Sequence, residues 1–143
     1  MTRYLLDTNI LLYARGGEHP YRDPCRATLL ASRDGRLSLE ASVEVVQEYA
    51  HVLLRRGDDR ATILDEVDEV RAMLRLLEFD TDVLTVTTEL LWSYADLGVR
   101  DAVHAATAIE ADIDRVLSTD RVFDLVHEVN RVDPTDPELM PRS

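Results

Sequence analysis

The sequence of 143 residues contains no lysine, so the 16 side chains counted as lysine or arginine are all arginines. Every mechanism that requires a lysine ammonium group is therefore excluded. The sequence also has a single cysteine, Cys25, which rules out an internal disulfide and a thiolate zinc site. We expect Cys25 to be a small, partly buried residue rather than a nucleophile, because no partner base is evident.

Long hydrophobic segments are absent as well. The longest apolar runs fall far short of the roughly 20 residues that a membrane-spanning helix needs, and residues 1–4 lack the pattern of a signal peptide. We therefore expect a soluble protein of the cytoplasm with no membrane association. Its hydrophobic fraction of 45% is sufficient for the core of one folded domain.

Acidic residues outnumber basic ones, and the formal net charge at pH 7 is −12. Negative charge repels the phosphates of nucleic acids, so charge alone makes nucleic acid a poor candidate ligand. This expectation changes if several carboxylates bind metal, because bound cations reverse the local field. The placement of the acidic residues therefore matters more than their number.

Short apolar runs alternate with longer amphipathic segments, a pattern typical of an α/β fold with a parallel sheet. Strands are expected at residues 4–6, 37–39, 116–118 and 128–132. Helices are expected from residue 10, over 21–33, over 42–56 with Ser42 as its cap, from 59 or 62 to 77, over 81–97 and over 101–112. We expect one domain over residues 1–133 and a short, loose C-terminal tail over 134–143.

Two of the expected strands run directly into an aspartate. Asp7 follows the first strand and Asp120 follows the strand at 116–118. Ligands of open α/β sheets bind outside the carboxyl ends of the strands, so both carboxylates would share one edge if these strands are neighbours. The alternative is that each caps a turn or a helix.

Two further segments offer acidic side chains. On the helix over residues 42–56, Glu44 lies in the middle of the polar face, whereas Glu48 lies at its boundary with the apolar face. A boundary carboxylate can point into a cleft, so Glu48 is the better candidate ligand. Asp101 opens an alanine-rich helix that is expected to be interior, where a carboxylate needs a cation such as Arg100 or a metal. The alternative for Asp101 is an ordinary N-cap.

Acidic residues from four separate segments suit a hard cation that prefers oxygen ligands, such as Mg²⁺ or Mn²⁺. Such an ion lowers the pKa of a bound water and orients a phosphodiester. The sequence shows no Ser-His-Asp arrangement, P-loop or glycine-rich dinucleotide motif. The residues therefore predict a divalent-metal site.

Four segments in order resemble the PIN-domain ribonucleases and, within them, the VapC-type toxins of bacterial and archaeal toxin–antitoxin pairs. The similarity spans residues 4–132, and its motifs are Leu5 to Asn9, Ser42 with Val46 to Tyr49, Arg100 to Ala106, and Ser118 to Phe123. The resemblance implies a PIN-like three-layer fold, in which a short central parallel sheet is flanked by helices.

The same resemblance implies an activity. Mg²⁺ or Mn²⁺ would be held by Asp7, Glu48, Asp101 and Asp120, and Asn9 and Thr119 would support these carboxylates by hydrogen bonding. A metal-activated water would attack RNA in line and leave 5′-phosphate and 3′-hydroxyl ends. The resemblance also implies a homodimer and a cognate antitoxin protein whose C-terminal segment enters the acidic cleft.

Other interpretations remain open at this point. A PIN-like domain could act as a binding or regulatory module with little catalysis. A phosphoryl-transfer domain of the receiver or haloacid-dehalogenase type is disfavoured, because these folds use a lysine near the phosphoryl group.

The roles of several other residues also stay open. Asp96, Asp124 and His104 could assist the site, and Trp92 and Tyr94 are expected in the core rather than at a dimer face. Arg55, Arg56 and Arg60 either form a solvated helix end or contact RNA phosphates.

Overall fold

A parallel sheet forms the centre of the computed structural model, which describes residues 1–140. The strands are β1 (Arg3–Leu6), β2 (Ser38–Ser42), β3 (Arg75–Leu77), β4 (Arg115–Leu117) and β5 (Asn130–Val132), in the spatial order β3-β2-β1-β4-β5. Every neighbouring pair is parallel. The predicted α/β class is therefore confirmed. Among the described residues, no helix is both long enough and apolar enough to cross a membrane.

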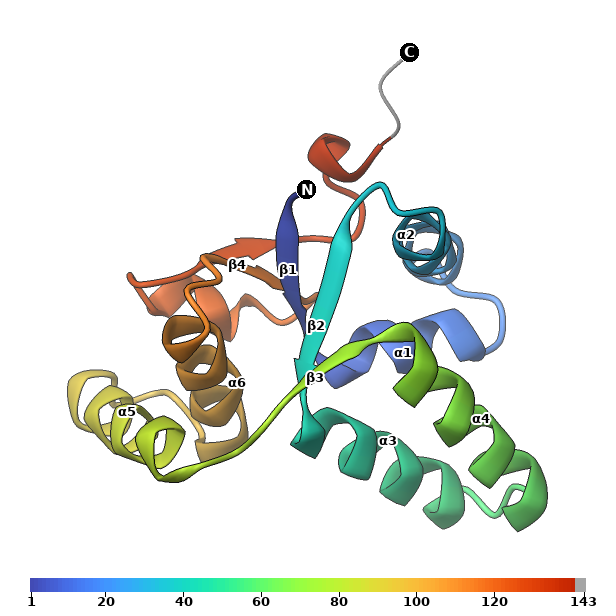
Figure 1. The fold of residues 1–143 in the computed structure, drawn as a ribbon, viewed down its shortest axis with the longest axis horizontal. Coiled ribbons are helices and arrows are strands. Elements are labelled where there is room, and N and C mark those ends of the chain that lie inside the picture. Colours follow the sequence, from blue (N-terminus) through green and yellow to red (C-terminus); the bar gives the residue numbers. More distant parts are fainter. Residues whose placement is uncertain (141–143) are drawn as a thin grey trace.

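Helices cover both faces of the sheet, which gives three layers (Figure 1). One layer contains α1 (Thr8–Arg15), α2 (Arg22–Arg33), α3 (Val43–Arg55) and α4 (Arg60–Met73), and the other contains α5 (Thr81–Ser93) and α6 (Val99–Glu110). Two separate apolar cores lie between these layers and the sheet. The central strand contributes to both, since Tyr4 and Leu6 pack in the first core and Leu5 in the second.

The strand β3 was not predicted, and the helix expected up to residue 77 ends at Met73. Leu74 is already extended, with φ −97° and ψ 144°, and Leu77 belongs to β3. The backbone of residues 75–77 pairs with residues 40–42 of β2 instead of continuing the helix. The helix expected over 81–97 likewise ends earlier, at Ser93.

The alanine-rich helix α6 begins two residues before its predicted start. Gly98 is its N-cap, so Asp101 lies within the first turn rather than at the cap position. Seven consecutive residues of this helix, from Ala102 to Ala108, are buried. The expectation of an interior helix is confirmed, and it places the Asp101 carboxylate near buried surroundings.

The segment after β5 is attached to the sheet, so the prediction of a loose tail is wrong for residues 134–140. A short 3₁₀-helix, η2 (Pro137–Leu139), places Glu138 where it accepts a hydrogen bond of 2.6 Å from the Tyr4 hydroxyl. Arg115 pairs with the same carboxylate at 3.0 Å. Residues 141–143 of the predicted tail lie outside the described residues.

Trp92 was expected in the core, and this prediction is wrong. Its side chain is 90% exposed near the end of α5. Tyr94 is partly buried against the second core, and its hydroxyl donates to Glu128 at 3.0 Å. The amphipathic period of α5 is satisfied by Val83, Thr87 and Leu90, which leaves the indole on the solvent side.

Candidate functional site

The first two candidate carboxylates meet at one edge of the sheet because β1 and β4 are neighbours. Leu6 is in register with Leu117, and the backbone N–H of Asp7 donates to the Leu117 carbonyl at 3.0 Å. Asp120 follows β4 and accepts a hydrogen bond of 3.0 Å from the N–H of Val122, so it also caps the 3₁₀-helix η1 (Arg121–Leu125). Asp7 makes no side-chain cap bond to α1, so its carboxylate is available for another role.

Ser118 links the two strand ends. Its hydroxyl is fully buried, donates to Asp7 Oδ2 at 2.6 Å and accepts from the backbone N–H of Asp120 at 3.0 Å. It also accepts from Asn9 Nδ2 at 3.3 Å. The single hydroxyl proton is therefore committed to Asp7. The sequence analysis did not assign this role to Ser118, because only its position between β4 and Asp120 could have indicated it.

Glu48 reaches the same edge from α3. Thr8 Oγ1 donates to Glu48 Oε2 at 2.8 Å, which ties α3 to the start of α1. Arg100 lies 3.4 Å from the other carboxylate oxygen of Glu48. Arg100 thus pairs with Glu48 rather than with Asp101, for which it was considered as the cation. Thr8 was also missed by sequence reasoning, since a hydroxyl after a strand carries no distinctive pattern.

Asp101 completes the group from the first turn of α6. Burial raises the pKa of Asp101 to about 6, and the charges of Asp120, Asp7 and Glu48 act in the same direction, while His104 opposes them. The carboxylates are therefore near enough for their charges to interact. The structure brings all four predicted residues into one partly buried acidic cluster, defined here as Asp7, Glu48, Asp101 and Asp120.

His104 lies inside this acidic cluster. Its side chain is 4% exposed, and Nε2 lies 3.8 Å from Asp7 Oδ1 and 4.0 Å from Glu48 Oε2. Within residues 1–140 its Nδ1 has no hydrogen-bond partner. Burial also raises the pKa of Asp7, an effect that His104 and Ser118 reduce. The imidazole is therefore a neighbour of two candidate ligands.

The remaining candidates differ in their position. Asn9 reaches Asp7 only through Ser118, and its buried Oδ1 has no partner in the described part of the chain. No hydrogen bond from Thr119 to a carboxylate is present among residues 1–140, so its supporting role stays a prediction. Asp124 pairs with Arg131 at 3.0 Å, and Asp96 is exposed.

The donor chemistry of the acidic cluster fits Mg²⁺ or Mn²⁺, because its members offer oxygen atoms and their mutual repulsion favours a neutralising cation. The side chains of the acidic cluster, as they lie in the structure, do not form a complete metal-coordination site. No three His, Cys, Asp or Glu side chains in residues 1–140 are placed to hold an ion as they stand. Side-chain rotation would therefore have to accompany binding.

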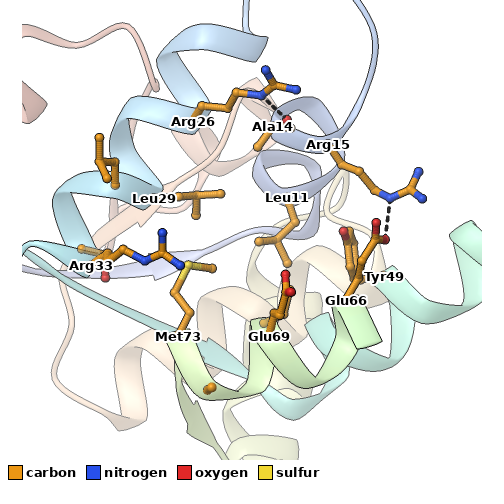
Figure 2. A pocket seen from close by; sticks show the side chains of 14 residues that line it. Leu11, Ala14, Arg15, Arg26, Leu29, Arg33, Tyr49, Glu66, Glu69 and Met73 are labelled. Carbon is orange, nitrogen blue, oxygen red and sulfur yellow. Dashed lines mark hydrogen bonds and ion pairs between the residues drawn. The ribbon is translucent and has the colours of Figure 1, made fainter. Parts of the chain in front are cut away.

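The acidic cluster borders two hollows. One of about 640 Å³ includes Asn9, Thr119 and Asp120, and the other, of about 510 Å³, includes Glu48 and His104. A further hollow of about 830 Å³ lies between α2 and α4 and contains none of the four carboxylates (Figure 2). There Arg15 pairs with Glu66 at 2.6 Å and Arg26 donates to the Ala14 carbonyl at 2.7 Å.

Comparisons with known proteins cover nearly the whole chain. A family model for the PIN domain matches residues 4–129. Ribonuclease VapC7 of Mycobacterium tuberculosis is 35% identical over 130 residues, which cover 87% of this chain and 90% of the relative. A toxin–antitoxin complex from Klebsiella pneumoniae has TM-score 0.68 and 18% identity, over 93% of this chain and 98% of that one. The sarcin–ricin loop cleaving toxin VapC20 of M. tuberculosis has TM-score 0.70 and 18% identity, over 87% and 95%.

Proposed function

The chain belongs to the PIN-domain family and, within it, to the VapC ribonucleases, and we propose that it is an endoribonuclease and the toxin of a toxin–antitoxin pair. In this proposal it hydrolyses RNA phosphodiesters with Mg²⁺ or Mn²⁺ held by Asp7, Glu48, Asp101 and Asp120. The observation that carries the proposal is the convergence of these four side chains, from four separate segments, at the carboxyl edge of the sheet.

The residues around the acidic cluster have distinct tasks in this mechanism. Ser118 orients Asp7 through its donated hydrogen bond, and Thr8 orients Glu48 in the same way. Arg100, whose side chain is 80% exposed, lies at the outer rim, where it attracts the substrate phosphate. A bound divalent cation supplies Lewis-acid chemistry, since it lowers the pKa of water and offsets the charge of the phosphodiester.

A bound cation would make the net charge of −12 compatible with an RNA substrate. Without a cation, the acidic cluster repels a phosphodiester at the position where the reaction takes place. A divalent cation would neutralise part of this negative charge and offer the phosphate a positive ligand at the reaction position, while the rest of the surface stays negative. RNA binding is therefore expected to depend on divalent metal.

We further propose two protein partners and a cytoplasmic location. An antitoxin partner is supported by the structural likeness to the Klebsiella toxin–antitoxin complex. A homodimer is supported by Trp92 of α5, which is 90% exposed, and by the exposed Leu84 of α5 and Val99 of α6 in the same layer. The cytoplasm is the compartment in which RNA substrates are present.

The experiment that tests the activity is cleavage of a structured RNA pool by the purified chain, with Mg²⁺ or Mn²⁺ and with chelator. We expect cleavage only with metal, and products with 5′-phosphate ends. Asp7→Asn and Asp101→Asn are expected to lower the rate by at least about 100-fold, because each removes a charged ligand. Asp65→Asn, on the exposed side of α4, is the matched control and should keep the rate.

Cleavage that persists unchanged in both site variants would indicate a contaminating nuclease and overturn the proposal. Metal-dependent RNA binding without cleavage would favour a binding or regulatory module, an alternative that the similarity to VapC ribonucleases does not favour.

A further inference from the structure

The hollow next to Asp120 contains groups that the metal chemistry does not use. Its lining includes Asn9, Thr119 and Asp120 of the site and, from other segments, Tyr13, His19, Arg56 and the exposed Glu18. Tyr13 belongs to α1, His19 lies between α1 and α2, and Arg56 is the C-cap residue of α3. Three separate segments thus place aromatic rings and a guanidinium beside one of the four carboxylates.

The aromatic side chains form a small stack, defined here as Tyr13, His19 and Tyr21. The Tyr13 and His19 ring centroids are 4.6 Å apart, Tyr13 and Tyr21 are 5.3 Å apart, and His19 and Tyr21 are 5.8 Å apart. Two hydrogen bonds hold the stack in place. The Tyr21 N–H donates to His19 Nδ1 at 3.1 Å, and the Tyr21 hydroxyl donates to Asp133 at 3.1 Å. His19 itself is exposed, so it presents a fixed ring to solvent.

Arg56 supplies positive charge at the same hollow. Its side chain is exposed, and no ion pair involving it is present in residues 1–140. Other arginines of the described residues, among them Arg26, Arg33 and Arg55, also lack an ion pair, but Arg56 is the one that lines this hollow. On a chain with a net charge of −12, an arginine without a carboxylate partner near the acidic cluster is suited to contact a phosphate.

We propose that this hollow binds one nucleotide of single-stranded RNA, adjacent to the phosphate that is cleaved. The base stacks on the exposed ring of His19, and the phosphate contacts Arg56. The inference rests on the proposed function, since it places the nucleotide next to a reaction at Asp120. Stacking on an aromatic ring is tolerant of sequence, because every base has a π-face. The subsite therefore contributes affinity and position rather than base identity.

The other two hollows are less suited to a nucleotide. The hollow between α2 and α4 contains Arg26 and Arg33, which have no carboxylate partner among residues 1–140, but Tyr49 is its single aromatic ring and Glu66 and Glu69 add negative charge (Figure 2). The hollow beside Glu48 also contains Glu44, and its Arg100 is paired with Glu48. Only the Asp120 side combines a stacked aromatic surface with an arginine that has no carboxylate partner in the described residues.

The first test measures RNA affinity by fluorescence anisotropy of a labelled single-stranded oligonucleotide in Ca²⁺, with gels of the same samples to verify intact RNA. His19→Ala should weaken binding about tenfold, because the base loses its stacking surface. His19→Phe keeps a ring and should restore most of the affinity. His127→Ala is the matched control, since His127 also packs against a tyrosine, at 5.8 Å from Tyr94, but does not line the hollow.

The second test uses salt. Arg56→Gln should weaken binding and lower the slope of log Kd against log salt by about 0.7, the value for one phosphate contact on a single strand. Arg55→Gln removes the same charge one residue earlier, outside the hollow, and should leave the slope unchanged. Equal slopes for the two variants would contradict a phosphate contact at Arg56.

Cleavage in Mg²⁺ separates this inference from the proposed function. If the wild type cleaves RNA while His19→Ala and Arg56→Gln match its KM and affinity, the nucleotide subsite is overturned and the nuclease stands. If both variants lose affinity while the wild type binds but does not cleave, the subsite is supported and the nuclease fails. Variants that bind RNA normally but lose affinity for a cognate antitoxin would mean that protein, not RNA, occupies the hollow, which also overturns the inference.

Discussion

Two hydroxyl groups determine how two of the acidic side chains are presented. Ser118 and Thr8 are both buried, and each donates to a different carboxylate of the acidic cluster. Neither was predicted, because single hydroxyl residues follow no periodicity and their role appears only when distant segments meet. The four carboxylates could be proposed as candidates, because strand ends, the boundary of a helical face and the start of an interior helix are visible in the sequence. Their grouping as one set of ligands came from the resemblance to PIN-domain ribonucleases, and their metal-binding role stays a prediction.

Thr8→Val tests the role of the Thr8 hydroxyl. Valine keeps the shape but cannot donate to Glu48, so we expect RNA cleavage to fall by about tenfold with little loss of folding, as for other groups that orient metal ligands. Thr8→Ser should retain most of the rate. Thr28→Val is the matched control, since Thr28 is equally buried but donates to the Pro24 carbonyl within α2. Equal rates for wild type and Thr8→Val would contradict this role.

Asp101→Asn should make the metal-free protein more stable. The pKa of Asp101 is raised from 3.8 to about 6, so the folded protein holds this proton more tightly than the unfolded chain. The free energy of unfolding of the wild type should therefore fall as pH rises from about 4 to about 6, and the loss persists at pH 7. Removing the charge should add about 1–2 kcal/mol at pH 7, after allowance for solvent screening.

Urea unfolding in chelator and in Mn²⁺ checks this expectation. At pH 4 the two proteins should have nearly equal stability. Mn²⁺ should stabilise the wild type and have little effect on Asp101→Asn. A wild type that is the more stable protein at pH 7 in chelator would mean that the clustered charges are already compensated within the fold.

At the scale of elements, the sequence patterns predicted most of the fold. They failed where the apolar spacing of a helix continues into a strand. Leu74 and Leu77 continue the apolar spacing of α4, yet residues 75–77 pair with β2 as an edge strand. Sheet pairing depends on a partner that is distant in sequence, so local periodicity could not identify β3. The strands β1 and β4 were predicted because burial on both faces leaves a short apolar run. The strand β2 was predicted at 37–39 but extends to Ser42, because Glu40 and Ser42 interrupt its apolar pattern.

The turn after α3 matters for the site, because it ends the helix that carries Glu48. Gly57 has φ +82°, in the left-handed region that favours glycine. Gly57→Ala should lower the free energy of unfolding by roughly 1 kcal/mol. Gly17→Ala is the control: its φ is not in this region and an added Cβ meets no atom within 4 Å, so the change should be close to neutral. Equal thermal midpoints for the two variants would contradict a requirement for glycine at position 57.

At the scale of the whole molecule, the acidic cluster and the most exposed aromatic side chain lie in different places. The acidic cluster lies at the carboxyl edge of the sheet, and the largest exposed apolar side chain, Trp92, lies on the layer formed by α5 and α6. The exposure of Trp92 was not predicted, because an aromatic residue in an amphipathic helix is usually buried. Its position is instead consistent with the proposed homodimer.

Trp92→Glu tests this surface. If the homodimer uses the α5 layer, a charged side chain there should shift the protein toward monomer by at least about tenfold in dissociation constant, as expected for a central aromatic contact. Sedimentation velocity over a range of concentrations measures the shift. Leu64→Glu, an exposed apolar position on α4 in the opposite layer, is the control. A wild type that is monomeric throughout would contradict the proposed dimer.

The proposed function requires that Asp7, Glu48, Asp101 and Asp120 bind one or more divalent cations at the edge of the sheet. The most direct measurement is an anomalous difference map at the manganese edge, from crystals of the wild type grown or soaked in Mn²⁺. We predict a peak at about 2.0–2.3 Å from carboxylate oxygens of at least three of these residues, and its loss in Asp101→Asn. The absence of a peak at this edge, or a peak only at other carboxylates, would contradict a metal site formed by these four residues.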